Sequence, residues 1–141
     1  MSETATALGI IRSQTVSKPT LCLDFDGVIH SYSSGWQGPS KIPDDPVPGA
    51  LMFLRDALDH FEVSIYSSRS GMPDGIAAMK NYLRRQVEAS FPEDEIGWIE
   101  QIQWPTVKPP AFVTIDDRAI TFTGQWPSFA ELLAFKPWNK R

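Results

Sequence analysis

Acidic and hydroxyl side chains stand where three predicted strands end: Asp24 and Asp26, then Ser67, then Asp116 and Asp117. Each group lies at the end of a short apolar run. In an open parallel α/β sheet, ligands bind outside the carboxyl ends of the strands. We therefore expect these residues, which are far apart in the sequence, to converge on one edge of a sheet.

Clustered carboxylates repel one another unless a cation or protons compensate their charge. Asp24 and Asp26 are two positions apart, so both side chains can face the same side of an extended backbone. Oxygen ligands alone favour Mg²⁺, which usually keeps several waters and takes substrate phosphate oxygens as further ligands. Lys108, which precedes the third apolar run, is a candidate second positive charge.

Each of these residues also has a purely structural interpretation. Asp24 and Asp26 could belong to a simple Asp-Gly turn, and two successive carboxylates can cap a helix. Ser67 could hydrogen-bond its own turn, and a single lysine such as Lys108 is most often a solvated surface residue. The occurrence of all of these residues at the ends of predicted strands favours a functional site over the separate structural interpretations.

The elements that must position these residues alternate between strands and helices. The spacing of apolar residues predicts strands over 21–25, 63–66 and 112–115, and helices over 51–61, 73–91 and 128–135. Weaker patterns suggest a further strand over 99–104 and an edge strand over 120–122. Such alternation implies βαβ units, hence a mostly parallel sheet flanked by helices in a single α/β domain.

The composition is that of an ordinary globular domain. The chain has 141 residues, 42% hydrophobic and 21% charged, with 13 Lys and Arg against 17 Asp and Glu and a net charge of −4. This length predicts one domain with a core that needs no disulfide or metal, and the composition excludes the disordered class. The acidic balance argues against non-specific nucleic-acid binding, which needs clustered positive charge.

Cysteine and histidine are too few for several kinds of site. Cys22 is the only cysteine, so it cannot form an internal disulfide, and its apolar neighbours predict a small buried side chain. With only two histidines, His30 and His60, a cysteine-type zinc site is excluded. No apolar stretch approaches the roughly 20 residues of a membrane span, and no secretory signal is visible. We expect a cytoplasmic protein that does not contact a membrane.

The motifs resemble those of the haloacid-dehalogenase-like (HAD) phosphohydrolases. The apolar strand and D-x-D-G of Leu21–Val28 look like the first motif of that family, and Thr114–Arg118 resembles its acidic fourth motif. Ser67 matches the Ser/Thr motif, and Lys108 stands where the lysine motif would be. The four motifs occur in the family order, and the resemblance covers about residues 20–138.

The resemblance implies a Rossmann-like fold and phosphoryl transfer through a covalent aspartyl-phosphate. Asp24 would be the nucleophile, and Asp26 would protonate the leaving group and then deprotonate the attacking water. Ser67 would hydrogen-bond a phosphoryl oxygen, and Lys108 would stabilise the transition state. An aspartate at the position of Asp26 goes with phosphatases and argues against dehalogenation.

The resemblance also implies the ligands of a Mg²⁺ ion. Asp24, the backbone carbonyl of Asp26, and either Asp116 or Asp117 would hold the ion. We favour Asp117 as the direct ligand, with Asp116 orienting Lys108 or a metal-bound water.

Larger family members carry a cap domain, whereas both possible insertion points are short here. Residues 1–18 are predicted to be a mobile N-terminal arm and 19–141 the catalytic domain, in which 28–48 would form a flap rather than a cap. Around this open site, we expect the substrate to be contacted by Ser67, Ser68, Arg69, His30 and Trp36. A partner subunit could shield the site, so a homo-oligomer is a possibility.

The predicted function is a Mg²⁺-dependent phosphatase that acts on a phosphomonoester. One alternative is a polynucleotide-end phosphatase, because Asp116–Arg118 is similar to the fourth motif of polynucleotide 3′-phosphatases. Its substrate would be a nucleic-acid end rather than a phosphorylated small molecule. Another is a catalytically inactive phosphate-binding or interaction module. A signalling receiver domain also clusters aspartates, but it has its acidic pair at the first strand and its phosphorylated Asp later.

Overall fold

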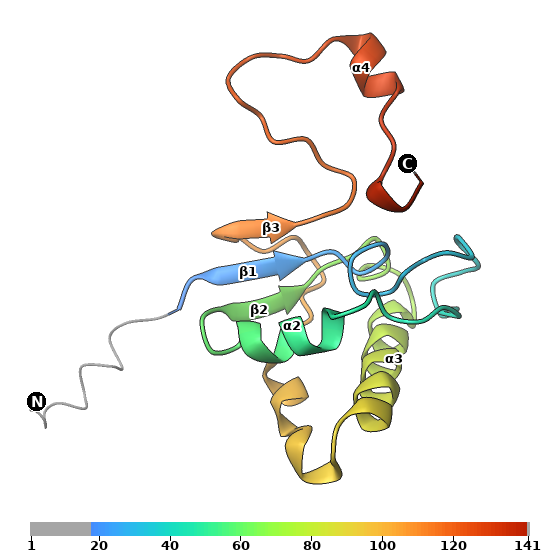
Figure 1. Cartoon of the computed structure of the whole chain (residues 1–141), viewed down its shortest axis with the longest axis vertical. Helices are drawn as coiled ribbons and strands as arrows, with labels where there is room; N and C mark the ends of the chain where they lie inside the picture. Colours follow the sequence, from blue (N-terminus) through green and yellow to red (C-terminus); the bar gives the residue numbers. More distant parts are fainter. Residues whose placement is uncertain (1–17, 141) are drawn as a thin grey trace, which may run out of the picture.

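A three-stranded parallel sheet forms the centre of the protein. The computed structural model describes residues 18–140, in which β1 (Thr20–Leu23), β2 (Glu62–Ile65) and β3 (Val113–Ile115) pair in the order β2-β1-β3 (Figure 1). In the sheet register, Leu23 of β1 lies opposite Ile65 of β2 and Ile115 of β3. The predicted parallel α/β class is confirmed, while the predicted mobile arm over 1–18 falls almost entirely outside the described residues.

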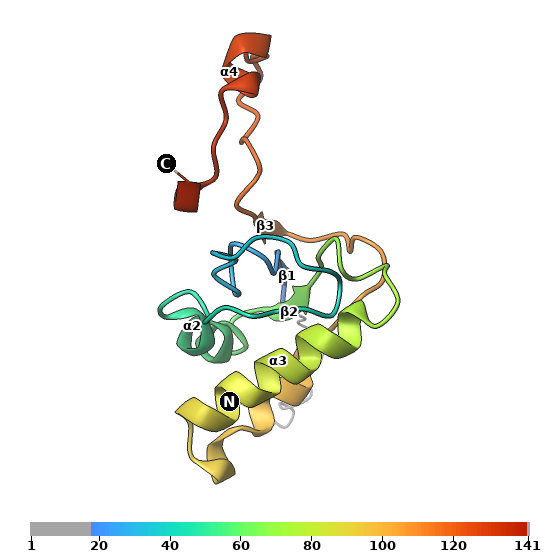
Figure 2. The same ribbon diagram turned by 90° about the vertical axis from the view of Figure 1, so that its right-hand side faces the viewer.

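Two helices follow the first two strands. The helix α2 (Ala50–Ala57) connects β1 to β2, and α3 (Gly75–Ser90) follows β2. Because the two crossovers run in opposite directions across the sheet, right-handed connections place these helices on opposite sides of it (Figure 2). The outer strand β3 is exposed along its length.

Neither of the two weaker strand predictions gives a strand, although Gln103 within 99–104 does pair in parallel with β2. Residues 99–101 are the end of a 3-10 helix, η4 (Gly97–Gln101), which follows η3 (Glu93–Glu95). Beyond this helix, Gln103 makes an isolated parallel bridge to Ser64 of β2, with backbone hydrogen bonds to Val63 and Ile65. Ile99 and Ile102 are three positions apart and both are buried, which suits a 3-10 turn better than strand alternation. Residues 120–122 form no strand, and the side chains of Ile120 and Phe122 are exposed.

The last part of the chain leaves the sheet and returns to it. Its short helix α4 (Phe129–Leu133) is capped by Ser128, whose side chain accepts from the backbone N–H of Glu131 while the Glu131 side chain accepts from the backbone N–H of Ser128. Figure 1 shows α4 far from the sheet and the final 3-10 helix, η5 (Trp138–Lys140), back beside it. The predicted flap, 28–48, contains no helix and no strand beyond isolated bridges.

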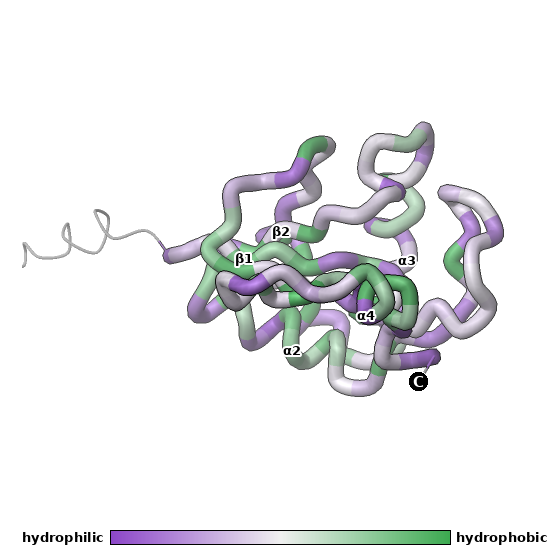
Figure 3. The backbone as a smooth tube through the Cα atoms, turned by 90° about the horizontal axis from the view of Figure 1, so that it is seen from above, coloured by the Kyte–Doolittle hydropathy of each residue, from purple (hydrophilic) through white to green (hydrophobic). Residues whose placement is uncertain are grey.

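The core is apolar and lies between the sheet and its two helices. Its members come from all of these elements: Leu21, Leu23, Phe25, Leu54, Val63, Ile65, Met79, Leu83 and Val87. Cys22 is buried in β1, as predicted. Seen from above in Figure 3, apolar colour follows the central strands. Within residues 18–140, no helix has the length and apolar character needed to cross a membrane.

Candidate functional site

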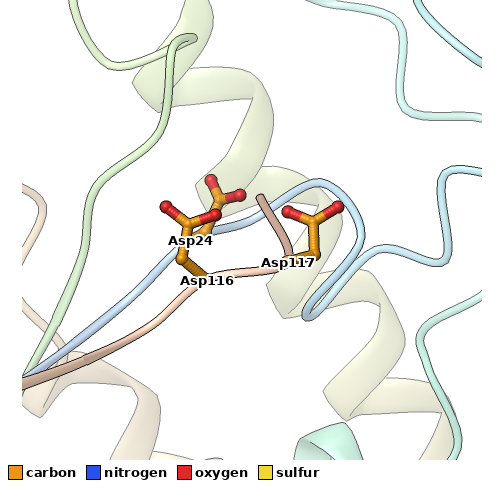
Figure 4. Close-up of side chains that lie close together, drawn as sticks. All are labelled: Asp24, Asp116 and Asp117. Carbon is orange, nitrogen blue, oxygen red and sulfur yellow. The ribbon is translucent and has the colours of Figure 1, made fainter. Parts of the chain in front are cut away.

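Three aspartates converge at the carboxyl edge of the sheet. Asp24 follows β1, and Asp116 and Asp117 follow β3, so the paired ends of two neighbouring strands bring them together (Figure 4). One carboxylate oxygen from each lies within 4.8 Å of the others. The backbone N–H of Asp24 also donates to the carbonyl of Ile115 at 3.0 Å, which extends the strand pairing to the cluster. The predicted convergence is therefore confirmed for these three residues, which we call the acidic cluster.

Asp24 is the most perturbed member of the acidic cluster. Burial raises the pKa of its carboxyl group to about 8, with a side-chain hydrogen bond to Asp117 and the charges of Asp116 and Asp117 acting in the same direction. The backbone N–H of Phe25 donates to Asp24 Oδ1 at 2.8 Å and opposes the shift. Without a cation, the cluster therefore holds a proton at neutral pH.

The position of Asp117 depends on Gly27. Gly27 has a φ of 84°, and a Cβ atom at this position would overlap the carboxylate of Asp117. Asp117 Oδ1 is buried and has no hydrogen-bond partner. Three converging carboxylates with one orphaned buried oxygen fit a hard cation, which takes oxygen ligands and supplies the missing partner.

Asp26 lies outside the acidic cluster and is held by two other side chains. Its carboxylate accepts from His30 Nδ1 at 2.9 Å and from Arg69 Nε and a terminal guanidinium nitrogen at 2.8 and 3.1 Å. Burial alone would raise the pKa of Asp26, but the hydrogen bonds from His30 and Arg69 and the guanidinium charge outweigh it and lower the pKa. The resting form of this carboxyl group is therefore the anion.

His30 links Asp26 to the flap. Its ring is fully buried, and its Nε2 accepts from the backbone N–H of Asp44 at 3.1 Å. Because Nε2 is then an acceptor, Nδ1 carries the proton that it donates to Asp26. Tyr82 of α3 donates its hydroxyl to the carbonyl of Asp44 at 2.8 Å, so the same flap residue is also held from the helix.

Arg69 fastens the flap from the other side. Its guanidinium is fully buried and donates to the carbonyl oxygens of Gly38 and Pro39 at 2.9 and 2.8 Å, in addition to Asp26. It also lies over the ring of Trp36, 4.7 Å from the ring centroid. Arg69 and His30 thus make interior contacts, and their expected contact with a substrate stays a prediction, as does that of the partly exposed Trp36.

The remaining predicted site residues lie around this edge. Ser67 is buried after β2, and its Oγ accepts from the backbone N–H of Arg69 at 3.1 Å, so the structural alternative of a local turn is realised. Ser68 next to it is exposed. Lys108 is exposed and makes no ion pair with any carboxylate of the described residues. Burial raises the pKa of the Cys22 thiol, and the positive charge of Lys108 opposes this shift.

Three residues around the site had no signal in the sequence. Trp138 Nε1 donates to the carbonyl of Gly27 at 2.7 Å, and Asn139 Nδ2 donates to that of Ser31 at 3.1 Å. Asp44 accepts at 2.6 Å from the hydroxyl of Ser34, within the flap, and touches His30. The contacts of Trp138 and Asn139 join residues more than a hundred positions apart, and those of Asp44 depend on how the flap folds, so neither leaves a local sequence pattern.

Searches against protein-family models, curated proteins and solved structures find no match to this chain. The fold and the site define it as a parallel α/β domain with an acidic cluster at the carboxyl edge of its sheet.

Proposed function

We propose that this protein is a Mg²⁺-dependent phosphatase that hydrolyses a phosphomonoester through an aspartyl-phosphate on Asp24. The observation that carries the proposal is the convergence of Asp24, Asp116 and Asp117 at the edge where ligands of such sheets bind. The resemblance of the first and fourth motifs to those of HAD phosphohydrolases supports the same chemistry.

The acidic cluster would hold the metal through carboxylate oxygens, with Asp117 Oδ1 offering the buried oxygen that has no other partner. When bound, Mg²⁺ supplies charge neutralisation that lets one anion approach another. The ion would also displace the proton that burial keeps on Asp24, which leaves this carboxylate free to act as a nucleophile.

In the first step, a carboxylate oxygen of Asp24 forms a bond to phosphorus while the bond to the leaving oxygen breaks. In the second, water attacks the aspartyl-phosphate and releases inorganic phosphate. Asp26 would manage the proton in both steps, and its hydrogen bonds to Arg69 and His30 favour its anionic form. Because Asp26 is seldom protonated, it is rarely available as the acid for the leaving group, so aryl phosphates, whose leaving groups need less protonation, should react faster than alkyl phosphates.

The test is phosphate release from a panel of aryl and sugar phosphates, nucleotides, and oligonucleotides with 3′- or 5′-phosphates. The wild-type protein is assayed with Mg²⁺ and with EDTA, beside Asp24→Asn and a control, Asp94→Asn, which alters an exposed aspartate of η3. We expect release that needs Mg²⁺, survives Asp94→Asn and is lost in Asp24→Asn. Release that survives Asp24→Asn would overturn the nucleophile assignment, and a preference for oligonucleotides would identify a polynucleotide-end phosphatase.

One observation favours a second candidate, a catalytically inactive phosphate-binding module. Asp26 is engaged by Arg69 and His30, and Lys108 forms no hydrogen bond or ion pair with the acidic cluster. A module of this kind would bind Mg²⁺ and inorganic phosphate, yet release no phosphate from any member of the panel. Calorimetric titration with both ions, run beside the turnover assay, separates the two candidates.

A further inference from the structure

The segment that connects β3 to η5 is apolar and exposed. We call residues 118–137 the C-terminal arm; only Arg118, Glu131 and Lys136 in it are charged. Its exposed apolar side chains are large: Ile120, Phe122, Trp126, Phe129, Leu132 and Leu133. Trp126, Phe129 and Leu133 are each more than four-fifths exposed, at 86%, 83% and 88%. Large apolar patches on a folded protein mark surfaces that another molecule covers.

The arm forms a hook-shaped loop, with α4 at its far end, that projects away from the sheet of its own chain. The rings of Phe122 and Trp126 lie 4.7 Å apart, and the capping box at Ser128 fixes the start of α4. A hollow of about 890 Å³ in the hook is lined only by arm residues between 120 and 132. Figures 1 and 2 both show α4 projecting beyond the sheet, and in Figure 3 it carries apolar colour. Between residues 120 and 133 the arm therefore has a defined shape and exposed apolar side chains, while Pro137 at its far end is buried.

The rest of the domain has an apolar groove that could cover the exposed side chains of an arm. The groove, of about 330 Å³, lies where β1, β3 and α2 meet, and Leu23, Phe53, Leu54 and Ile115 are among its lining residues. Phe53 and Ile115 remain 46% and 39% exposed there. In a layered α/β domain a helix beside α2 would cover this part of the sheet, and no helix of the described chain does so.

We propose that the groove receives the C-terminal arm of a second copy of this chain. Each copy then offers one arm and one groove, so two copies exchange arms around a two-fold axis and leave no arm or groove open. A single chain leaves both surfaces open, because the return of η5 to Gly27 anchors the far end of the arm and α4 points outward.

The area available is large enough for a specific dimer. A fully covered aromatic side chain buries about 150–250 Å². Covering half of three aromatic side chains on each arm, with equal area in the grooves, buries about 900–1,500 Å² in total, which reaches the size of the smaller specific interfaces.

The experiment measures the mass of the full chain in solution by sedimentation across a range of concentrations. The arm variant is Phe129→Asp with Leu133→Asp, the groove variant is Phe53→Asp, and Val107→Asp is the control, since Val107 is 71% exposed and lines neither surface. We expect a dimer for the wild type and the control. Both other variants should dissociate at least about a hundredfold more readily, because an unpaired charge would enter an apolar contact. Circular dichroism verifies that each variant is folded.

Mixing the two variants gives a test that misfolding cannot imitate. The groove variant keeps an intact arm and the arm variant keeps an intact groove, so the mixture should form heterodimers joined by one arm in one groove. A monomeric wild type would overturn the proposal and indicate that the arm folds onto its own body or meets a different protein. A dimer that persists in both variants, or a mixture that stays monomeric, would overturn it as well.

Discussion

A Cβ atom on Gly27 would overlap the carboxylate of Asp117, so the position of one member of the acidic cluster depends on the absence of a side chain three residues after Asp24. Gly27→Ala should displace Asp117 and weaken Mg²⁺ binding by at least about tenfold. Separately, the positive φ should lower the free energy of unfolding of the alanine variant by roughly 1 kcal/mol. Calorimetric titration with Mg²⁺ measures the first effect and urea unfolding the second.

The matched control for this variant is Gly35→Ala. Gly35 has a similar φ, 75°, but a Cβ atom there meets no atom within 4 Å. It should lose the same conformational stability and keep its Mg²⁺ affinity. Equal losses of affinity in both variants would show that the packing of Asp117 against Gly27 does not govern Mg²⁺ affinity.

The acidic cluster should make Mg²⁺ binding depend on pH. In the metal-free protein the pKa of Asp24 is raised from 3.8 to about 8. The unfolded chain therefore releases this proton first, and the metal-free fold loses stability as the pH rises between these two values. Because Mg²⁺ must displace the proton, its affinity should rise by about tenfold per pH unit below 8 and level off above that. Thermal unfolding with and without Mg²⁺ across this range checks the trend, and Asp24→Asn should flatten it.

Arg69→Ala should destabilise the fold strongly. The substitution leaves the largely buried Asp26 carboxylate without its guanidinium partner, which costs up to about 3–5 kcal/mol. Because the pKa of Asp26 is lowered in the folded protein, the stabilisation from its partners is present above 3.8 and is lost as the pH falls. The deficit of the variant in urea unfolding should therefore shrink in acid.

Arg84→Ala is the control for that measurement. Arg84 pairs with Glu100 on the surface, where both side chains are about half exposed or more, and such pairs contribute under about 1 kcal/mol. Similar losses in the free energy of unfolding for the two variants would show that the ion pair between Arg69 and Asp26 stabilises the fold no more than a surface ion pair does.

Trp138→Phe should loosen the loop that carries Gly27. The substitution keeps an aromatic ring but removes the hydrogen bond from Nε1 to the Gly27 carbonyl, at a cost of about 1–2 kcal/mol. Mg²⁺ affinity should fall with it. Trp98→Phe is the comparison, since Trp98 Nε1 is buried without a partner and its removal breaks no hydrogen bond. A fall in Mg²⁺ affinity in both variants, or in neither, would contradict this role of Trp138.

The strands that carry the site could be predicted because each is a short apolar run ended by polar residues. The segment around Ile99 and Ile102 could not, since two isoleucines three positions apart suit either a short strand or a 3-10 turn. The arm was also unpredictable beyond its capped helix. Ile120 and Phe122 alternate like an edge strand, but no neighbouring strand of the described chain pairs with them.

The acidic cluster could be predicted from the sequence because the carboxyl ends of parallel strands meet at one edge of the sheet. No such general property predicts the partners of Asp26. An arginine is ordinarily assigned to the surface, and the burial of Arg69 arises only when the flap folds over it, 30 positions away in sequence. The structure thus adds the surroundings that decide the charge of Asp26.

The clamp that Arg69, His30 and Tyr82 place on the flap has a consequence for how molecules would enter and leave. To swing open like a lid, the flap would have to break the contacts that hold it, among them those of a buried guanidinium. The two hydrogen bonds from the Arg69 guanidinium to flap carbonyls contribute about 1.5–3 kcal/mol each, so fewer than about one molecule in a hundred would have an open flap at any moment. Ligands would then bind to and leave the acidic cluster without waiting for the flap to open. Flap motion should therefore add no dependence on solvent viscosity to the rates of binding and release. Discrimination between ligands would rest on a rigid shape, present before any ligand arrives.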